Sequence, residues 1–223
     1  MKGLLSVIKI SLPKQLYIKE PETSNLGKRI VENGILLIDE VGFESFTFKK
    51  LGKKIGSNES SIYRYFESKH KFLLYLTSWY WAWLEYQLVL ATFSITNTQK
   101  KLEKAITIVT QTVKEDSNFN HINEVVLYRI IVNESSKSFL TKEVDEENKQ
   151  GYFEIYKRLI MRLEEMILAV KPKYPFALSL ASSILEGGIH QHFLHEHFTK
   201  ITNYNSKKTP TDFFIELTTR TLL

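Results

Sequence analysis

The sequence of 223 residues contains no cysteine. This absence excludes a disulfide scaffold, a thiolate zinc site, an iron–sulfur cluster and a cysteine nucleophile, and it agrees with a reducing compartment. A Gly-rich phosphate loop, a nucleophile elbow and a His-Glu-x-x-His motif are also missing, so no pattern supports an enzyme. We therefore expect a protein that is not an enzyme and holds no cofactor or metal.

Long hydrophobic runs are scarce as well. The longest apolar and aromatic stretch, residues 72–90, is interrupted by Ser78 and Glu85 and is rich in Trp and Tyr. This composition favours a buried or interfacial helix over a membrane span. The N-terminal apolar run is short, contains Lys9 and lacks a small-residue cleavage site. We expect no membrane contact and a cytoplasmic location.

The charge of the chain is concentrated in one place. The net charge is +5, and residues 45–71 carry all of this excess, with seven Lys or Arg and two Glu, whereas residues 1–44 and 72–223 are each neutral. A local basic segment points to a polyanionic partner, with nucleic acid favoured over a membrane. A solvated basic face is the equally open alternative. Hydrophobic residues make up 43% of the chain, which is ordinary for one large domain or two small ones.

Helical periodicity with little β pattern predicts an all-α fold. Capping residues and glycines mark four helices near the N-terminus. These helices open at Thr23 or Ser24, at Thr47, at Ser57 or Asn58, and at Ser68, and the first two end at Gly42 and Gly56. Further helices are predicted at residues 98–114, 119–133, 143–170, 176–198 and 210–222.

Two short helices joined by a tight glycine turn form a helix-turn-helix pattern at residues 47–66. Apolar residues spaced for one shared face are Leu51, Ile55, Ile62 and Phe66, and Gly52 is small where the two helices cross. The rest of the second short helix is polar, and such side chains reach base edges or phosphates in a major groove. The starts of the helices at Thr47 and at Ser68-Lys69 are natural phosphate sites.

The segment from Gly42 to Lys69 resembles the DNA-binding segment of the TetR/AcrR family of bacterial repressors. The shared pattern is a glycine followed by an aromatic residue, a threonine that opens a helix, an apolar-small pair, a turn glycine and an apolar-Tyr-x-aromatic-Phe-x-x-Lys tail. Here these positions are Gly42-Phe43, Thr47, Leu51-Gly52, Gly56 and Ile62-Tyr63-Arg64-Tyr65-Phe66-Glu67-Ser68-Lys69. The likeness extends over roughly residues 24–75.

The resemblance implies an N-terminal helix-turn-helix domain of three helices followed by a larger helical domain for ligand binding and dimerisation. We place an arm at residues 1–22, the DNA-binding domain at 23–72 and the regulatory domain at 73–223. By residue matching, the resemblance implies that the residues holding phosphates are Thr47, Tyr63, Tyr65 and Lys69. It implies that the residues facing bases or nearby phosphates are Lys49, Glu59, Ser60, Ser61 and Arg64. Glu59 and Ser60 depart from the residues that are usual in the family. For the arm, a disordered tail is favoured over a segment that contacts DNA.

The resemblance further implies a transcriptional regulator, typically a repressor that a small molecule releases from a pseudo-palindromic duplex operator. A homodimer would form through residues 176–198 and 210–222. The apolar faces expected there are Leu180, Ile184, Gly187, Gly188 and Ile189 on one helix and Phe213, Phe214, Leu217 and Leu222 on the other. The effector itself is not specified by the sequence.

Two clusters outside the motif have competing interpretations. Trp79, Trp83 and Tyr86, together with His190, are candidates for a ligand pocket, against the favoured alternative of ordinary core packing. The histidines of residues 190–197 raise the alternative of a metal-dependent enzyme or sensor, although a polar interface or pocket edge is favoured because successive ligands diverge on a helix. Another alternative is a helix-turn-helix that contacts protein instead of DNA. The acidic residues 143–147 are predicted to be a solvated helix start.

Overall fold

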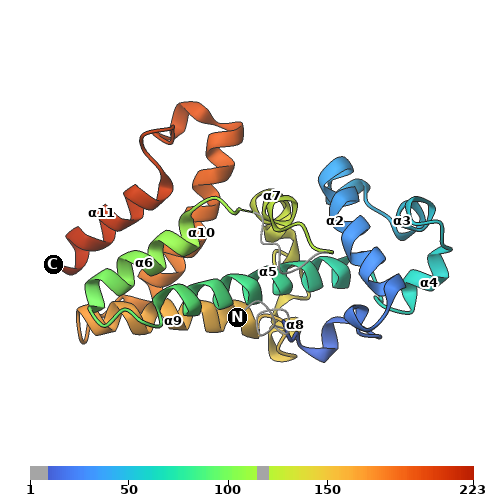
Figure 1. Ribbon diagram of the computed structural model, residues 1–223, viewed down its shortest axis with the longest axis horizontal. Coiled ribbons are helices and arrows are strands. Elements are labelled where there is room, and N and C mark those ends of the chain that lie inside the picture. The colour runs from blue at the N-terminus through green and yellow to red at the C-terminus, as the bar shows by residue number, and fades with distance from the viewer. Residues whose placement is uncertain (1–9, 115–120) are drawn as a thin grey trace. The chain divides into compact units, whose positions relative to one another are not determined.

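The computed structural model describes residues 10–114 and 121–223 and confirms the all-α expectation (Figure 1). These ranges contain no strand, only an isolated bridge between Asn205 and Lys208. The α-helices are α2 (Asn25–Ser45), α3 (Phe48–Lys54), α4 (Glu59–Tyr63), α5 (Lys69–Thr92), α6 (Thr98–Thr110), α7 (Glu124–Glu134), α8 (Val144–Lys149), α9 (Glu154–Val170), α10 (Ala177–His197) and α11 (Pro210–Leu222). Short 3-10 turns are η1 (Lys14–Leu16), η2 (Pro21–Thr23), η3 (Ser135–Ser138) and η4 (Thr199–Ile201). None of the described helices is long and apolar enough to cross a bilayer.

The chain divides into two compact units that are each built from two stretches of sequence. The first unit comprises Met1–Ala82 and Val113–Glu154, and the second comprises Trp83–Thr112 and Ile155–Leu223. The helix α5 contributes its first part to one unit and its last part to the other. In the first unit α2 packs against α7 and α3 packs against α4, and in the second α6 packs against α10 and α11.

The helix α2 begins and ends where its capping residues predict. The Ser24 hydroxyl accepts a hydrogen bond from the Gly27 backbone N–H, 3.1 Å away. The helical backbone breaks at Gly42, whose φ of +75° lies in the left-handed region that glycine adopts without strain. The chain can therefore turn from α2 towards α3 at this point.

Phe72 lies at the centre of the core of the first unit and is fully buried. Its ring stacks on Phe46 at a centroid distance of 5.6 Å and meets Phe66 edge-on at 4.8 Å and Phe48 at 6.3 Å. A side chain at Gly34 of α2 would collide with the Phe72 ring. The ring therefore joins α2, α3 and the end of α4 to α5.

The single helix predicted at residues 143–170 is wrong. The chain forms α8 and α9 instead, separated at Gly151, whose φ is +83°. That backbone conformation is incompatible with a continuous right-handed helix, and glycine adopts it at low cost. The predicted solvated helix start is also only partly correct, because Glu147 is buried, whereas Asp145 and Glu146 are exposed.

The expectation of a disordered N-terminal tail is wrong for residues 10–22. Leu16 is fully buried, and the Ile18 backbone N–H donates to the Tyr65 carbonyl oxygen over 2.8 Å. A side chain at Gly27 would collide with the backbone of Pro21, so this segment also packs closely on α2. Residues 1–9 lie outside the described part of the chain, as do residues 119 and 120 of the helix predicted at 119–133.

Close packing in the second unit depends on two consecutive glycines of α10. A side chain at Gly187 would collide with the ring of Phe214 on α11, and one at Gly188 would press on Thr110 of α6. Next to this contact, the buried His192 donates from Nε2 to the Thr110 carbonyl oxygen over 2.8 Å. Burial lowers the pKa of His192, which favours this neutral, singly donating form.

Glu85 is a buried carboxylate of α5 that binds two arginines of α9. Arg158 forms a bidentate pair with it through Nε and Nη2, at 2.7 and 2.5 Å, and Arg162 donates from Nε over 2.6 Å. Burial acts to raise the pKa of Glu85, but the hydrogen bonds and charges of the two arginines outweigh burial and hold the pKa below its usual value. This cluster fastens α9 to the last part of α5.

The folded state lowers the pKa of Glu85, so the ionised carboxylate stabilises the fold. We expect this contribution to be fully present above the ordinary carboxyl pKa and to be lost as the pH falls through the folded-state pKa. At neutral pH, Glu85→Gln is expected to cost about 1–2 kcal/mol, a value discounted because both guanidinium groups are partly exposed. Urea unfolding of both proteins at neutral pH and at about pH 3 measures this. A difference in unfolding free energy that does not shrink at the lower pH contradicts the assignment.

Candidate nucleic-acid interface

The two short helices α3 and α4 form the predicted helix-turn-helix. Gly56 has a φ of +62°, the left-handed conformation expected of the turn glycine. Gly52 lies where the helices approach most closely: its carbonyl accepts from the Ser57 N–H over 2.9 Å, and a Cβ on Gly52 would be 2.8 Å from the Ser57 carbonyl oxygen. The apolar residues Leu51 and Ile62 are fully buried, as their spacing predicts.

The three helix starts are capped by the predicted residues. Thr47 accepts from the Lys50 N–H at 3.2 Å, and Ser68 accepts from the Lys71 N–H at 3.1 Å. Asn58, the second of the two candidates for α4, accepts from the Ser61 N–H at 2.9 Å. Its Oδ1 also accepts from both serine hydroxyls of α4, Ser60 at 2.9 Å and Ser61 at 2.6 Å. Asn58 therefore orients both hydroxyls, a role that sequence reasoning missed although its cap position was recognised.

The side chains predicted to contact DNA fall into three groups by exposure. Thr47, Lys49, Ser60, Tyr63 and Arg64 are exposed. Glu59, Ser61 and Lys69 are partly exposed. Tyr63 leaves 47% of its surface exposed while its ring rests edge-on against Phe48 at 5.1 Å, so its hydroxyl is held at a fixed height above α3.

Tyr65 differs from the other predicted residues because it is buried, with 3% of its surface exposed. Its hydroxyl forms a 2.7 Å hydrogen bond with the hydroxyl of Ser24, the cap of α2. The expectation of an exposed side chain is therefore wrong for Tyr65, and its predicted contact with a phosphate would require this bond to open. The spacing of three residues from the buried Ile62 is the sequence signal for this burial, although Tyr65 itself lies in the turn after α4.

Lys69 connects the start of α5 to the end of α2. Its ammonium group donates to the carbonyl oxygens of Phe43 at 3.2 Å and Glu44 at 3.1 Å, and it lies 4.8 Å from the centroid of the Phe43 ring. These two carbonyls belong to the turn that leads into Thr47. Lys69 therefore brings a positive charge to the start of α5 and fixes the neighbouring turn.

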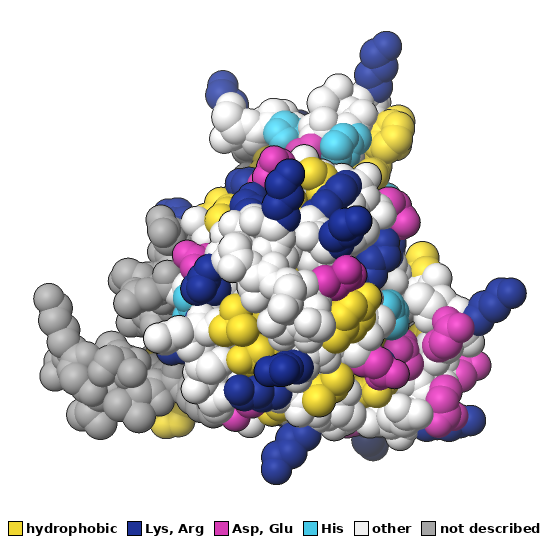
Figure 2. Space-filling model, turned by 90° about the vertical axis from the view of Figure 1, so that its right-hand side faces the viewer, with side chains coloured by type: hydrophobic (Ala, Val, Ile, Leu, Met, Phe, Trp, Pro, Cys, Tyr) yellow, Lys and Arg dark blue, Asp and Glu magenta, His cyan; other side chains and the backbone are white. Residues whose placement is uncertain are grey.

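Four further cations of the basic segment, Lys49, Lys50, Lys53 and Lys54, lie along α3. Lys50 donates to the Ser45 carbonyl at 2.7 Å, and Lys54 pairs with Glu40 at 2.9 Å. Figure 2 looks onto the side of the molecule where α3 and α4 lie in Figure 1 and shows Lys and Arg side chains on that face, together with hydrophobic, Asp and Glu side chains. The four lysines of α3 are all exposed, which suits a polyanion that is contacted at several points.

The candidate ligand-pocket residues are divided between the two units. Trp79 belongs to the first unit, whereas Trp83, Tyr86 and His190 belong to the second. The two tryptophans are buried, Tyr86 is partly buried and His190 is exposed. A groove of about 400 Å³ lies between α10 and α11, and its lining includes none of these four residues. A role for them in ligand binding stays a prediction.

The histidines of α10 engage aromatic rings and a carbonyl. His190 stacks with Phe193, His195 lies 4.0 Å from the ring of Tyr204, and His192 is bonded to the Thr110 carbonyl. Glu186 accepts a 2.6 Å hydrogen bond from Tyr156. Among the described residues, no group of three or more His, Asp or Glu side chains is arranged to hold a metal ion.

The faces expected at a dimer interface are partly used inside the chain. Ile184, Ile189 and Phe214 are buried, and Gly187 and Gly188 receive neighbouring helices. Of the expected residues, Phe213 and Leu217 are exposed, at 53% and 39%. Other exposed apolar residues of this region include Phe176, Leu178, Phe198 and Ile201. Phe213 and Leu217 lie one turn apart on α11, so they form a continuous apolar strip.

Comparison with known proteins places the helix-turn-helix within a described family pattern. Residues 30–76 match the family model "Bacterial regulatory proteins, tetR family". This range includes α3, α4 and the first turns of α5, and it therefore contains every residue predicted here to contact DNA. No curated protein sequence matches the chain.

Several solved structures share the fold over most of their length. A bacterial regulatory protein in the tetR family from Rhodococcus RHA1 has a TM-score of 0.60 and 16% identity, over 89% of this chain and 97% of that one. AibR in complex with isovaleryl coenzyme A and operator DNA has a TM-score of 0.58 and 16% identity, over 85% and 97%. The superantigen PfiT has a TM-score of 0.58 and 14% identity, over 91% and 97%. At these identities the likeness shows the fold alone.

Proposed function

We propose that this chain, whose residues 30–76 match the tetR family of bacterial regulatory proteins, is a sequence-specific DNA-binding transcriptional regulator of that family. The observation that carries the proposal is α4 itself. This short helix exposes Ser60, Tyr63 and Arg64 beside the lysines of α3, within a helix-turn-helix whose caps and turn are intact. Hydroxyl, phenol and guanidinium groups at such a position can read base edges and hold phosphates.

The proposed division of labour follows the sequence expectation. Residues 23–72 bind DNA, and residues 73–223 bind an effector and a second copy of the chain. Direct contacts come from the exposed and partly exposed residues of α3, α4 and the start of α5. Tyr65 has a different part in this proposal: it fixes the end of α4 through its bond to Ser24.

The proposed active form is a homodimer on a pseudo-palindromic operator in the cytoplasm. The exposed strip of Phe213 and Leu217, with Ile201 and Phe198 nearby in the sequence, supports a second copy at α10 and α11. A dimer fits DNA when its two recognition helices are roughly 34–36 Å apart. A small-molecule effector that binds a form with another spacing more tightly would release the DNA. The loss of DNA affinity can be no larger than the difference in the effector's affinity for the two forms.

We expect Phe213→Glu to raise the dissociation constant of the dimer by at least about thirtyfold, because an exposed ring that the proposed dimer covers is replaced by an unpaired charge. Sedimentation velocity over a range of concentrations measures the change. Ser94→Glu adds the same charge at another exposed position and is expected to leave the dimer intact. Equal sedimentation of the two variants would rule out this face as the interface.

The test of the proposed function is a selection of random duplex DNA on the purified protein, followed by binding anisotropy at several salt concentrations. We expect an enriched palindrome that the wild type binds tightly and a Tyr63→Ala, Lys69→Ala variant does not. Absence of enrichment, with weak binding that depends only on salt, would overturn the proposal. The alternative is then a helix-turn-helix used for protein contacts. The similar fold of the superantigen PfiT is the reason for naming this alternative.

A further inference from the structure

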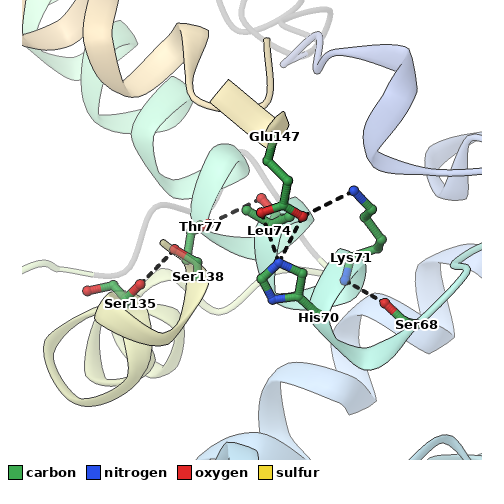
Figure 3. A network of polar contacts seen from close by, with 8 residues as sticks. All are labelled: Ser68, His70, Lys71, Leu74, Thr77, Ser135, Ser138 and Glu147. Atoms are coloured by element: carbon green, nitrogen blue, oxygen red, sulfur yellow. Dashed lines mark hydrogen bonds and ion pairs between the residues drawn. The ribbon is translucent and has the colours of Figure 1, made fainter. Parts of the chain in front are cut away.

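The short helix α8 is held against the start of α5 by one buried carboxylate. Glu147 accepts from His70 Nε2 at 3.0 and 3.1 Å and from the Lys71 ammonium group at 3.3 Å, as Figure 3 shows. The ammonium group of Lys71 also lies 3.6 Å from the centroid of the Tyr152 ring. A carboxylate is buried at an acceptable energetic cost only with such partners. Asp145, on the same helix, is exposed, in contrast to the buried Glu147.

The partners of Glu147 are next to a residue of the proposed DNA interface. His70 and Lys71 directly follow Lys69, whose ammonium group binds the carbonyls of Phe43 and Glu44. The position of α8 is therefore linked to the first turn of α5 and, through Lys69, to the turn that precedes Thr47. Each link is a direct polar contact within the first unit.

The N-terminal segment 15–19 connects the other end of α8 to the turn that follows the recognition helix α4. The Gln15 side chain donates from Nε2 to the Gln150 carbonyl at the end of α8, over 2.8 Å. Three residues later, the Ile18 N–H donates to the Tyr65 carbonyl, and the Lys19 ammonium group lies 5.2 Å from the centroid of the Tyr65 ring. Leu16, between these contacts, is fully buried and fixes the segment in place. This segment therefore connects the end of α8 to Tyr65, in the turn after α4.

We propose that α8 is a positioning element for DNA binding: Glu147 fixes the first turn of α5, Gln150 fixes the turn after α4 through segment 15–19, and displacement of α8 weakens DNA binding. The inference rests on the proposed function and adds its regulation. The helix α9 begins at Glu154, only a short turn after α8. An effector that moves the start of α9 would therefore pull on α8 through the chain itself.

The direction in which the affinity for DNA changes distinguishes a positioning role of α8 from a simple effect of its charge. Glu147→Gln and Asp145→Asn each remove one negative charge from α8. If charge alone matters, both variants bind DNA slightly more tightly, because a repulsion is lost. If α8 positions the interface, Glu147→Gln binds the selected duplex about tenfold more weakly, whereas Asp145→Asn does not. Equal behaviour of the two variants overturns the proposal.

A second pair of variants tests segment 15–19 without disturbing the buried carboxylate. Ile18→Pro removes the N–H that bonds Tyr65, and the preceding Tyr17 is already extended, as a residue before proline must be. Ile18→Ala shortens the same exposed side chain but keeps the N–H. We expect loss of affinity for Ile18→Pro and for Gln15→Ala, with Ile18→Ala close to the wild type. Wild-type affinity for both Ile18→Pro and Gln15→Ala would overturn the proposed connection.

Hydrogen exchange distinguishes a local change in position from general loss of stability. In Glu147→Gln, exchange is expected to accelerate at Lys71 and Phe72, whose N–H groups bond to Ser68, and to stay unchanged in the middle of α5. Uniform acceleration along α5 would mean that Glu147 only stabilises the fold and would overturn its positioning role. A wild type that selects no duplex refutes the proposed function, a result distinct from failure of α8.

Discussion

Replacing Tyr63 by Phe and Lys69 by Ala together is expected to weaken binding to the operator and to random duplex alike, by about a hundredfold. Each variant removes one hydrogen bond to a charged phosphate, and such a bond is worth about 1.5 kcal/mol or more. Tyr63→Phe keeps the ring that rests on Phe48, so it removes the exposed hydroxyl alone. Phosphate contacts carry no base information, so the loss should not depend on sequence.

Salt dependence gives an independent measure of the same contact. The slope of log affinity against log salt should become shallower by about 0.9 for each phosphate that Lys69 no longer neutralises. Lys104→Ala removes an exposed positive charge from α6 and is the matched control. If Lys104→Ala changes the slope as much as Lys69→Ala, the effect is one of net charge and Lys69 makes no specific contact.

Arg64→Ala and Ser61→Ala provide the contrast, because these positions are assigned to base edges or nearby phosphates. Both are expected to change the preferred sequence more than the overall affinity. The readout is the ratio of operator to random-duplex affinity for each variant. An equal loss on both duplexes for Arg64→Ala would contradict its assignment as a specificity residue.

The largest effect on stability is expected for Phe72→Ala, which should cost about 3–5 kcal/mol, as removal of a buried phenyl ring does. The ring is fully buried and contacts Phe46, Phe48 and Phe66, so its loss leaves a cavity where α2, α3 and α4 meet α5. Chemical unfolding measures the change, and DNA binding should fall with it because the helix-turn-helix rests on this ring.

A substitution at Gly34 tests the same contact, because the effect of Gly34→Ala on stability should change sign when Phe72 is replaced by Ala. In the wild type, Gly34→Ala places a methyl group against the Phe72 ring and should destabilise the protein by about 1–3 kcal/mol. In Phe72→Ala the collision is gone, and alanine in a helix interior should stabilise it by about 0.5–1 kcal/mol. Additive effects of the two substitutions would show that Phe72 and Gly34 do not share the contact.

Local signals in the sequence were sufficient to predict the helix-turn-helix. Thr47, Asn58 and Ser68 cap their helices and Gly56 turns the chain, because capping and positive φ depend on only a few neighbouring residues. The same local logic contained the signal that was missed at Gly151, a glycine within a predicted helix. A family match over residues 30–76 agrees with this part of the prediction.

The parts that could not be predicted depend on residues far apart in the chain. Glu147 is buried because His70 and Lys71, more than seventy positions earlier, donate hydrogen bonds to its carboxylate. The residues of α8 alone predict only an acidic, solvated helix. Likewise, the order of the segment around Leu16 depends on contacts with Tyr65 and Gln150 that no short window contains.

The discontinuous make-up of the first unit has a consequence for the newly made protein. Its DNA-binding helices are translated early, but α7 and α8, which anchor them through Glu134 to Phe43 and through Glu147 to Lys71, are translated after residues 83–112 have been made. At about 5–20 residues per second, Glu147 follows Lys71 by roughly 4–15 seconds. A nascent chain on the ribosome therefore carries the surface for DNA before it carries the residues that hold that surface in position.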